Sequence, residues 1–311
     1  MNWQTVVAER SALGESPFWH PQESQLYWVD ISARQIRRAN AFTGALEKWD
    51  MPSEPGCIAP AASGGLVIAL RDGIYRARSW GGALMPLVRF NHDTDTMRFN
   101  DGKCDAQGRF WAGTIYEPRD ARRADLYCID CRPANGNGGK PQVQLKAHNA
   151  TIANGLGFAP DDRTLYWADT PLHVVHAWDW EPSANAMRRH RVFHQFKPKP
   201  PGWRWDDPAA APYGGRPDGA AVDAEGCYWV AMMEGARLAR LSPEGHEIAS
   251  VALPVLRPTM PCFGGDDLRT LYVTSIGHGA SDAELARYPE AGRILSMRVD
   301  VPGLPVNFFV D

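Results

Sequence analysis

Four acidic or amide side chains stand at the starts of short strand-like segments in this sequence, and together they could bind a cation. They are Glu15, Asn100, Asn154 and Asp218. Two carboxylates held together without a cation would repel each other, and one of them would have to keep its proton. A divalent ion would balance both charges, and amide oxygens would complete an all-oxygen ligand set that suits Ca²⁺, Mg²⁺ or Mn²⁺, with Zn²⁺ and Fe²⁺ as alternatives. Asn-Gly and Asp-Gly are also common turn sequences, so each residue alone has a purely structural explanation.

These side chains can meet only if their segments are arranged around one axis, and the sequence is repetitive in a way that suggests this. Residues 15–30 and 154–169 share one layout, in which a short strand and a polar turn lead into an aromatic strand that ends in Asp. Related copies occupy residues 61–69, 104–114, 218–231 and 262–274. The aromatic strands are spaced by 40, 43, 56, 62 and 44 residues, and they centre on Trp28, Ile68, Trp111, Trp167, Trp229 and Val273.

A base period of about 40 to 45 residues is typical of a four-stranded propeller blade. We therefore predict an all-β, six-bladed β-propeller that forms one domain over residues 1–311, with insertions near 131–142 and 197–217. A β-sandwich would contain similar turns but not six copies of one layout. The ring should close when a strand at residues 3–8 pairs into the blade formed by residues 294–301 and 307–310. A helix of one or two turns is expected at 281–288.

The innermost strands of a propeller line its central channel, so the four polar residues at their starts should converge there. This convergence favours a cation site over four unrelated turns. A serine hydrolase is not indicated, because no G-x-S-x-G motif occurs. His148 lies shortly before the Asn154 segment, and a supporting role behind the ligands is one possibility for it.

Composition excludes several classes of partner. The formal net charge is −3 and no run of one sign occurs, so neither nucleic acid nor a membrane is an expected partner. The N-terminal residues show no secretory signal, so we expect a cytoplasmic protein, a monomer or a weak dimer. The six cysteines should be reduced thiols, and the C-x-x-C pair at 128 and 131 should be structural.

Five stretches resemble the senescence marker protein/gluconolactonase/regucalcin family of six-bladed propellers. They are LGESPFW at 13–19, RFNDGK at 98–103, NGLGFAPD at 154–161, RPDG at 216–219 and PCFGG at 261–265, and they extend over nearly the whole chain. The resemblance implies that Glu15, Asn154 and Asp218 are the metal ligands. It places Asn100 beside the metal and makes Arg98 a substrate-binding residue, with either Glu117 or Tyr116 as a further contact.

The resemblance implies hydrolysis of a sugar lactone with one divalent metal ion, calcium being the first expectation. Metal-bound water would attack the lactone carbonyl, with Asp218 as the general base and the metal as a Lewis acid. Arg98 would donate to sugar hydroxyls, and Trp203, Trp205 and Tyr213 would either stack on the sugar or pack on the rim. A calcium-dependent esterase of the organophosphate type and a non-enzymatic calcium-binding regulator are the alternatives.

Overall fold

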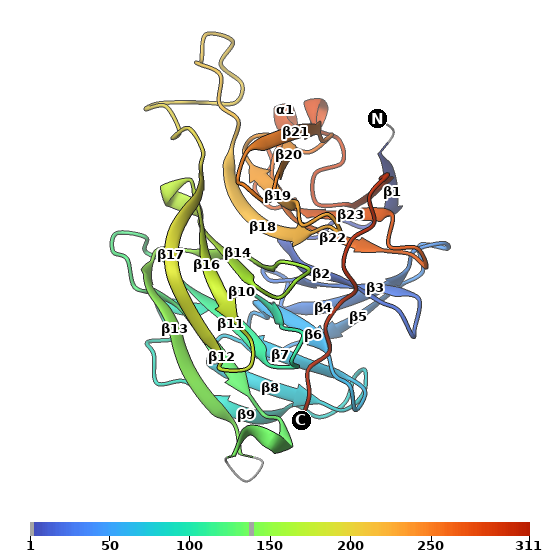
Figure 1. Cartoon of the computed structure of the whole chain (residues 1–311). Coiled ribbons are helices and arrows are strands. Elements are labelled where there is room, and N and C mark those ends of the chain that lie inside the picture. Colours follow the sequence, from blue (N-terminus) through green and yellow to red (C-terminus); the bar gives the residue numbers. More distant parts are fainter. Residues whose placement is uncertain (1–2, 137–139) are drawn as a thin grey trace.

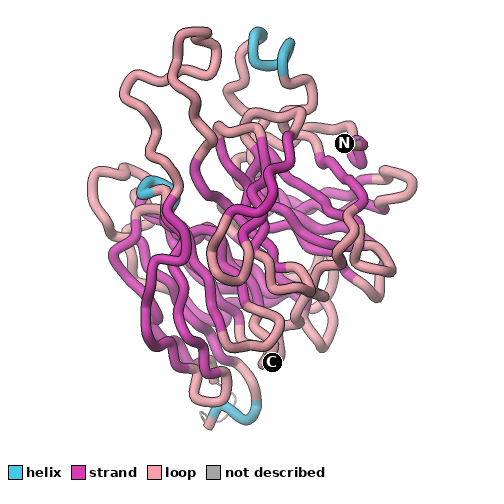
Figure 2. The backbone as a smooth tube through the Cα atoms, turned by 45° about the horizontal axis from the view of Figure 1, so that its top comes forward, coloured by secondary structure: helices cyan, strands magenta, loops and turns pink. Residues whose placement is uncertain are grey.

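Six four-stranded antiparallel sheets stand around a central channel in the computed structural model, which describes residues 3–136 and 140–311 (Figure 1). The predicted six-bladed β-propeller is therefore confirmed. In each of the first five blades the strands follow one another in sequence from the channel outward, and the sixth blade has the order β22-β23-β24-β1 from the inside. The tube view shows that strands form nearly all of the regular structure (Figure 2).

The strands of the first three blades are β2 (Gly14–His20), β3 (Gln25–Asp30), β4 (Gln35–Asn40) and β5 (Leu46–Asp50); β6 (Cys57–Pro60), β7 (Leu66–Leu70), β8 (Gly73–Ala77) and β9 (Met85–Arg89); and β10 (Met97–Cys104), β11 (Phe110–Tyr116), β12 (Ala124–Asp130) and β13 (Gln142–Ala150). Those of the last three are β14 (Ala153–Phe158), β15 (Thr164–Asp169), β16 (Val174–Glu181) and β17 (Ala186–Gln195); β18 (Arg216–Val222), β19 (Tyr228–Met233), β20 (Arg237–Leu241) and β21 (Glu247–Ala252); and β22 (Pro258–Gly264), β23 (Thr270–Ser275), β24 (Ile294–Arg298) and β1 (Gln4–Val7).

Packing between neighbouring blades explains why Asp and Trp recur in the repeat. The aromatic strand is the second strand of each blade, and it is buried on both faces because neighbouring blades cover it. A buried indole needs a partner for its N–H group. Asp105 accepts from Nε1 of Trp111 at 2.9 Å, and Asp223 accepts from Nε1 of Trp229 at the same distance. The turn carboxylate and the strand Trp thus stabilise the same hairpin.

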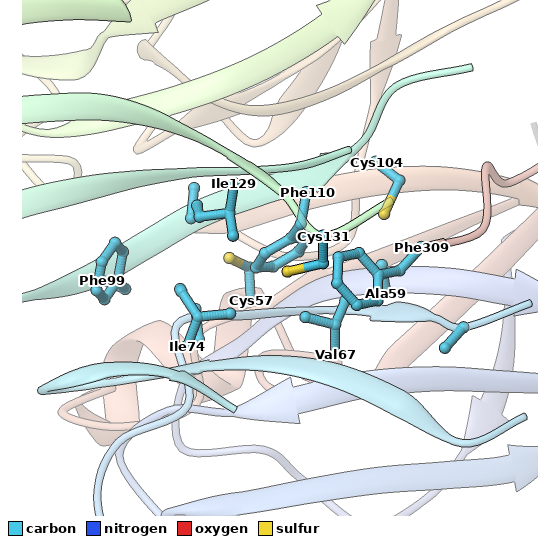
Figure 3. Packing of buried hydrophobic residues seen from close by; sticks show 13 residues of the cluster. Cys57, Ala59, Val67, Ile74, Phe99, Cys104, Phe110, Ile129, Cys131 and Phe309 are labelled. Carbon is cyan, nitrogen blue, oxygen red and sulfur yellow. The ribbon is translucent and has the colours of Figure 1, made fainter. Parts of the chain in front are cut away.

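The ring closes as predicted at the N-terminal strand, because β1 pairs antiparallel with β24. The prediction for residues 307–310 was wrong. These residues leave the sixth blade, and Phe309 forms a bridge with Ala61 of the second blade. The Phe309 ring is fully buried in an apolar cluster that includes Cys131 and Val67 (Figure 3). Burial of this ring against the second and third blades explains why the tail crosses the molecule instead of extending the sixth sheet.

Two long connections fall where insertions were expected. Residues 131–142 contain the short 3₁₀ helix η1 (Pro133–Asn135) and precede β13, but residues 137–139 lie outside the described part of the chain. Residues 196–215 connect β17 to β18 without any strand and rise from the same end of the molecule as α1 (Asp282–Arg287) (Figure 1). Ser281 caps α1 by accepting from the backbone N–H of Glu284, which confirms the predicted helix.

The cysteines agree with the expectation of reduced thiols. All six cysteines are buried free thiols. None of the helices in the described ranges is long and apolar enough to cross a membrane.

Candidate functional site

The four predicted cation-binding residues lie on the innermost strands of four different blades. Glu15 is on β2, Asn100 on β10, Asn154 on β14 and Asp218 on β18, and all four are buried. The pairing register of each of these strands shifts beside the polar residue; the inner strand β22 also shifts, between Pro258 and Pro261, whereas the inner strand β6 pairs without a shift. A β-bulge changes the direction of the side chains that follow it. The bulges thus coincide with the points where polar groups face the channel.

Glycine is required at one of these bulges. Gly155 directly follows Asn154 and has a φ of +60°. A Cβ atom there would lie 2.2 Å from the hydroxyl oxygen of Tyr228. That hydroxyl donates to the carbonyl of Gly155 at 2.6 Å, so the tyrosine holds the backbone next to Asn154 in place.

Hydrogen bonds orient the two amide side chains differently. Asn100 donates through Nδ2 to Oδ1 of Asn154 at 2.7 Å and to the carbonyl of Ala153 at 3.0 Å. Asn154 in turn donates through Nδ2 to Oγ1 of Thr170 at 2.8 Å. Each amide oxygen accepts one hydrogen bond and keeps a second lone pair, but the donor to Oδ1 of Asn100 is the positively charged Arg98, at 2.9 Å, which disfavours a second cation there. This pattern suits Asn154 as a ligand with Asn100 beside it.

The two carboxylates are close enough to perturb each other. Burial raises the pKa of Glu15 well above its ordinary value, and the negative charges of Asp218 and Asp101 raise it further. Burial also raises the pKa of Asp218 to about 7, although the neighbouring arginines Arg216, Arg119 and Arg98 oppose the shift. Desolvation is the main cause of both shifts, and it favours the protonated carboxyl.

This donor set fits a divalent ion. Two carboxylates would match its charge, and Asn154 would add a neutral oxygen. Within residues 3–136 and 140–311, no three His, Cys, Asp or Glu side chains are grouped as metal ligands. Any ion bound here would therefore rely on Glu15, Asp218 and the amide.

Asp101 and Lys103 also reach the channel, and the sequence pattern predicted a role for neither. Asp101 is buried, and its Oδ2 accepts from the backbone N–H of Leu156 at 2.9 Å. Its Oδ1 has no hydrogen-bond partner within the described ranges. Lys103 donates from Nζ to the carbonyl of Ala220 at 2.9 Å. Two charged residues follow Asn100 closely in the sequence and could have indicated that this segment belongs to the site. In a regular strand, however, Asp101 would point away from the channel.

Arg98 lies at the entrance to the site and is held by several acceptors. Its Nε donates to Glu117 at 3.2 Å, and NH1 donates to the carbonyl of Phe99 and to Asn100, both at 2.9 Å. Its NH2 group makes no hydrogen bond to any described residue. Tyr116 is buried with the guanidinium of Arg123 over its ring, so Glu117 is the one of the two candidates that contacts Arg98.

The aromatic residues of the 196–215 connection contact protein groups. The hydroxyl of Tyr213 lies 2.7 Å from Nε2 of His173, and the Tyr213 ring packs on Trp203 with centroids 4.9 Å apart. Trp205 packs on Tyr288, which follows α1. His148 is exposed on the outermost strand β13, so the structure does not bring it to the site.

The sequence is similar to known proteins over almost its whole length. A family model described as the SMP-30/Gluconolactonase/LRE-like region matches residues 13–277. A 6-deoxy-6-sulfogluconolactonase from Pseudomonas putida is 38% identical over 304 residues, which cover 98% of this chain and 97% of that protein. A regucalcin from Danio rerio is 30% identical over 305 residues, with 97% and 96% coverage.

A solved structure shares the fold. It is a calcium-binding protein, regucalcin, from Agrobacterium tumefaciens, and it matches with a TM-score of 0.85 over 98% of this chain and 96% of that chain. The two sequences are 22% identical.

Proposed function

Because this chain belongs to the SMP-30/gluconolactonase/LRE-like family, as its sequence motifs predicted, we propose that it is a carboxylic ester hydrolase that opens a sugar lactone to the aldonic acid with one divalent metal ion. The observation that carries the proposal is that Glu15 and Asp218 are buried carboxyls on different inner strands and interact electrostatically, while a Cβ at Gly155, next to Asn154, would lie 3.0 Å from the Asp218 carbonyl oxygen. The relative from Pseudomonas putida is named for a sulfonated gluconolactone, which makes a hexonolactone the first candidate.

Glu15, Asn154 and Asp218 would hold the ion, and Asn100 would lie beside it. Calcium is the first candidate because oxygen-only sites suit hard cations, and zinc, manganese, magnesium or iron(II) are alternatives. When bound, such an ion would polarise the lactone carbonyl and acidify water.

Asp218 is the proposed general base. As a water oxygen forms its bond to the lactone carbonyl carbon, one carboxylate oxygen of Asp218 takes the proton that the water loses. The ring C–O bond then breaks, and the proton passes to the departing ring oxygen, which becomes a hydroxyl group. The pKa of about 7 is that of Asp218 without an ion; a bound divalent cation would keep this carboxyl ionised at neutral pH, and an ionised carboxylate can accept the proton.

Arg98, Asn100 and Glu117 are the proposed substrate contacts. The free NH2 group of Arg98 would donate to a sugar hydroxyl, while its other nitrogens stay bound to Glu117 and Asn100. Glu117 is also paired with Arg71 at 3.0 Å, so this carboxylate fixes the position of the Arg98 guanidinium.

The test is Asp218→Asn, with Asp300→Asn as the matched control because Asp300 is exposed after β24. Asn keeps an oxygen ligand but cannot act as the base. We expect lactone hydrolysis by D218N to fall at least about a hundredfold, as is typical for loss of a general base, and D300N to match the wild type. Base-catalysed lactone opening by this residue is excluded if D218N retains near wild-type kcat at pH 7 with saturating calcium.

The same assay separates the alternatives. A phosphotriester in the substrate panel tests the esterase of the organophosphate type. Calcium binding without opening of any lactone would instead support the regulator.

A further inference from the structure

A cavity of about 280 Å³ lies at the far end of the channel, beyond the polar residues that would hold an ion. Its walls come from the later residues of the six inner strands, and they are mainly apolar, with Phe18 of β2, Phe158 of β14 and Phe263 of β22 among them. At about 30 Å³ per water molecule, the cavity has room for about nine waters. This volume suits a small organic molecule with an apolar body.

The C-terminal tail covers part of the mouth of this cavity. The backbone N–H of Leu304 donates to the carbonyl of Val222 at 3.4 Å, and Nδ2 of Asn307 donates to the carbonyl of Cys104 at 3.2 Å. The tail is thus attached to the fifth blade and to the third, and between these points residues 304–307 form part of the cavity wall (Figure 1). The cavity is therefore enclosed by a dedicated segment of the chain and is more than the open end of a channel.

Lys103 places a positive charge in these apolar surroundings. It lines the cavity, and its side chain extends from β10 so that Nζ donates to the carbonyl of Ala220 on β18 at 2.9 Å. An ammonium group has three donors, and this is the one hydrogen bond that it makes to a described residue. No carboxylate within residues 3–136 and 140–311 lies at ion-pair distance from Nζ. Burial lowers the pKa of Lys103, because the charged form loses water, and the charge of Asp101 opposes this shift only in part.

Neither of two nearby carboxylates neutralises Lys103 directly. Asp101 lies toward the polar residues, where its Oδ2 accepts from the backbone N–H of Leu156 at 2.9 Å. Asp162 lines the cavity from the turn between β14 and β15, at the mouth. A molecule that enters the cavity would therefore meet apolar walls along its length and an ammonium group with free donors at the inner end.

We propose that this cavity binds a small monocarboxylate with an apolar tail, and that the carboxylate pairs with Lys103. A carboxylate oxygen would accept from the free ammonium donors, and the ion pair would offset the cost of keeping this charge among apolar side chains. The apolar tail of the ligand would lie between the phenylalanine rings and residues 304–307. The cavity and the proposed lactone site lie on opposite sides of Glu15 and Asp218, so the inference does not depend on lactone hydrolysis.

The experiment uses octanoate as the probe and octanamide as its neutral analogue of the same length. Binding is measured by calorimetry with calcium-loaded protein and again in a chelating buffer. We expect octanoate to bind about tenfold or more tightly than octanamide in both buffers, because only the carboxylate pairs with the ammonium group. Hexanoate should bind about tenfold more weakly than octanoate, because two fewer CH₂ groups are buried.

The variant Lys103→Gln removes the charge but keeps a donor for the carbonyl of Ala220. Lys48→Gln is the control with the same change of net charge, because Lys48 is exposed on β5 and is paired with Glu9. We expect K103Q to bind octanoate no more tightly than octanamide, and K48Q to match the wild type.

A second variant keeps the test decisive if K103Q does not fold. Val306 lines the cavity from the C-terminal tail, so Val306→Trp leaves Lys103 in place and should fill the cavity with the indole. Ile248→Trp, on the exposed outer strand β21, is the matched control. We expect V306W to weaken octanoate binding about tenfold or more and I248W to leave it unchanged.

Three outcomes would overturn the inference. Equal affinities of the wild type for octanoate and octanamide, or no binding of either, would show that the cavity recognises no carboxylate. Undiminished octanoate binding by K103Q, or by V306W if K103Q does not fold, would show that octanoate binds elsewhere. Octanoate binding that disappears in chelator would show that the carboxylate binds the metal ion instead of Lys103.

Discussion

Without the proposed divalent ion, the stability of this protein should depend on pH through Asp218. Burial raises the pKa of Asp218 from 3.8 to about 7. Between these values the folded, ion-free protein keeps a proton that the unfolded chain has lost. The contribution of this proton to stability is complete below pH 3.8, and it is lost as the pH rises through 7.

One pKa unit corresponds to about 1.4 kcal/mol, so the shift at Asp218 implies a loss of about 3 kcal/mol of unfolding free energy between pH 5 and pH 8. The unfolding entropy of a 311-residue chain is about 0.65 kcal/mol/K at 2.1 cal/mol/K per residue. The expected decrease of Tm is therefore about 4–5 °C. Glu15 should add to the effect, because burial shifts its pKa in the same direction.

The assay is thermal unfolding in a chelating buffer at pH 5, 6, 7 and 8 for the wild type, Asp218→Asn and the control Asp300→Asn. Subtraction of the Asp218→Asn curve removes the contribution of titrating groups that do not interact with Asp218; Glu15 does interact with it, so its change is part of the measured difference. We expect the wild type and D300N to lose about 4–5 °C relative to D218N, and calcium to abolish this loss by balancing the carboxylates. Parallel curves for the wild type and D218N in chelator would refute the reasoning, since they would show that Asp218 is not a buried, unpaired carboxyl.

Two further changes test the supports of the site and of the ring. Thr170→Val removes the acceptor that orients Asn154, so calcium affinity measured by calorimetry should fall about tenfold or more, whereas Thr43→Val in an exposed turn should not change it. Phe309→Ala empties a fully buried position between the second and third blades, so the free energy of unfolding should fall by about 3–5 kcal/mol in denaturant titrations; a loss below about 1 kcal/mol would show that the C-terminal tail does not stabilise the ring.

The repeat made the blades and the ring closure predictable because it has a simple physical origin. A second strand that is buried on both faces must be apolar, and a Trp such as Trp111 needs a nearby acceptor such as Asp105. These needs recur in several blades and leave a visible period. Residues 307–310 belong to no repeat, so nothing in their pattern indicated that Phe309 would pack against the second blade.

The candidate site was predictable only where it follows the register of the blades. Glu15, Asn154 and Asp218 occupy matching points of the repeat, so their placement on inner strands could be read from the sequence. Asp101 reaches the channel because β10 is bulged between Phe99 and Gly102. A bulge of this kind leaves no periodic signal in the sequence.

The channel differs on the two sides of the polar residues, and this difference explains how buried carboxylates are tolerated there. Beyond the polar residues, the same strands line a cavity of about 280 Å³ with mainly apolar walls, and residues 304–307 of the tail contribute to it. Apolar surroundings on that side desolvate Glu15 and Asp218 and leave few groups there to offset their charges. Lys103 lines this cavity and its charge acts on Asp101, whereas Arg98 and Arg216 precede the polar residues on β10 and β18 and offset the charge of Asp218 from the opposite side. The same desolvation that destabilises the ion-free protein would thus increase the affinity of the site for a divalent cation. The variant D218N should therefore be more stable than the wild type in chelator and should bind calcium more weakly.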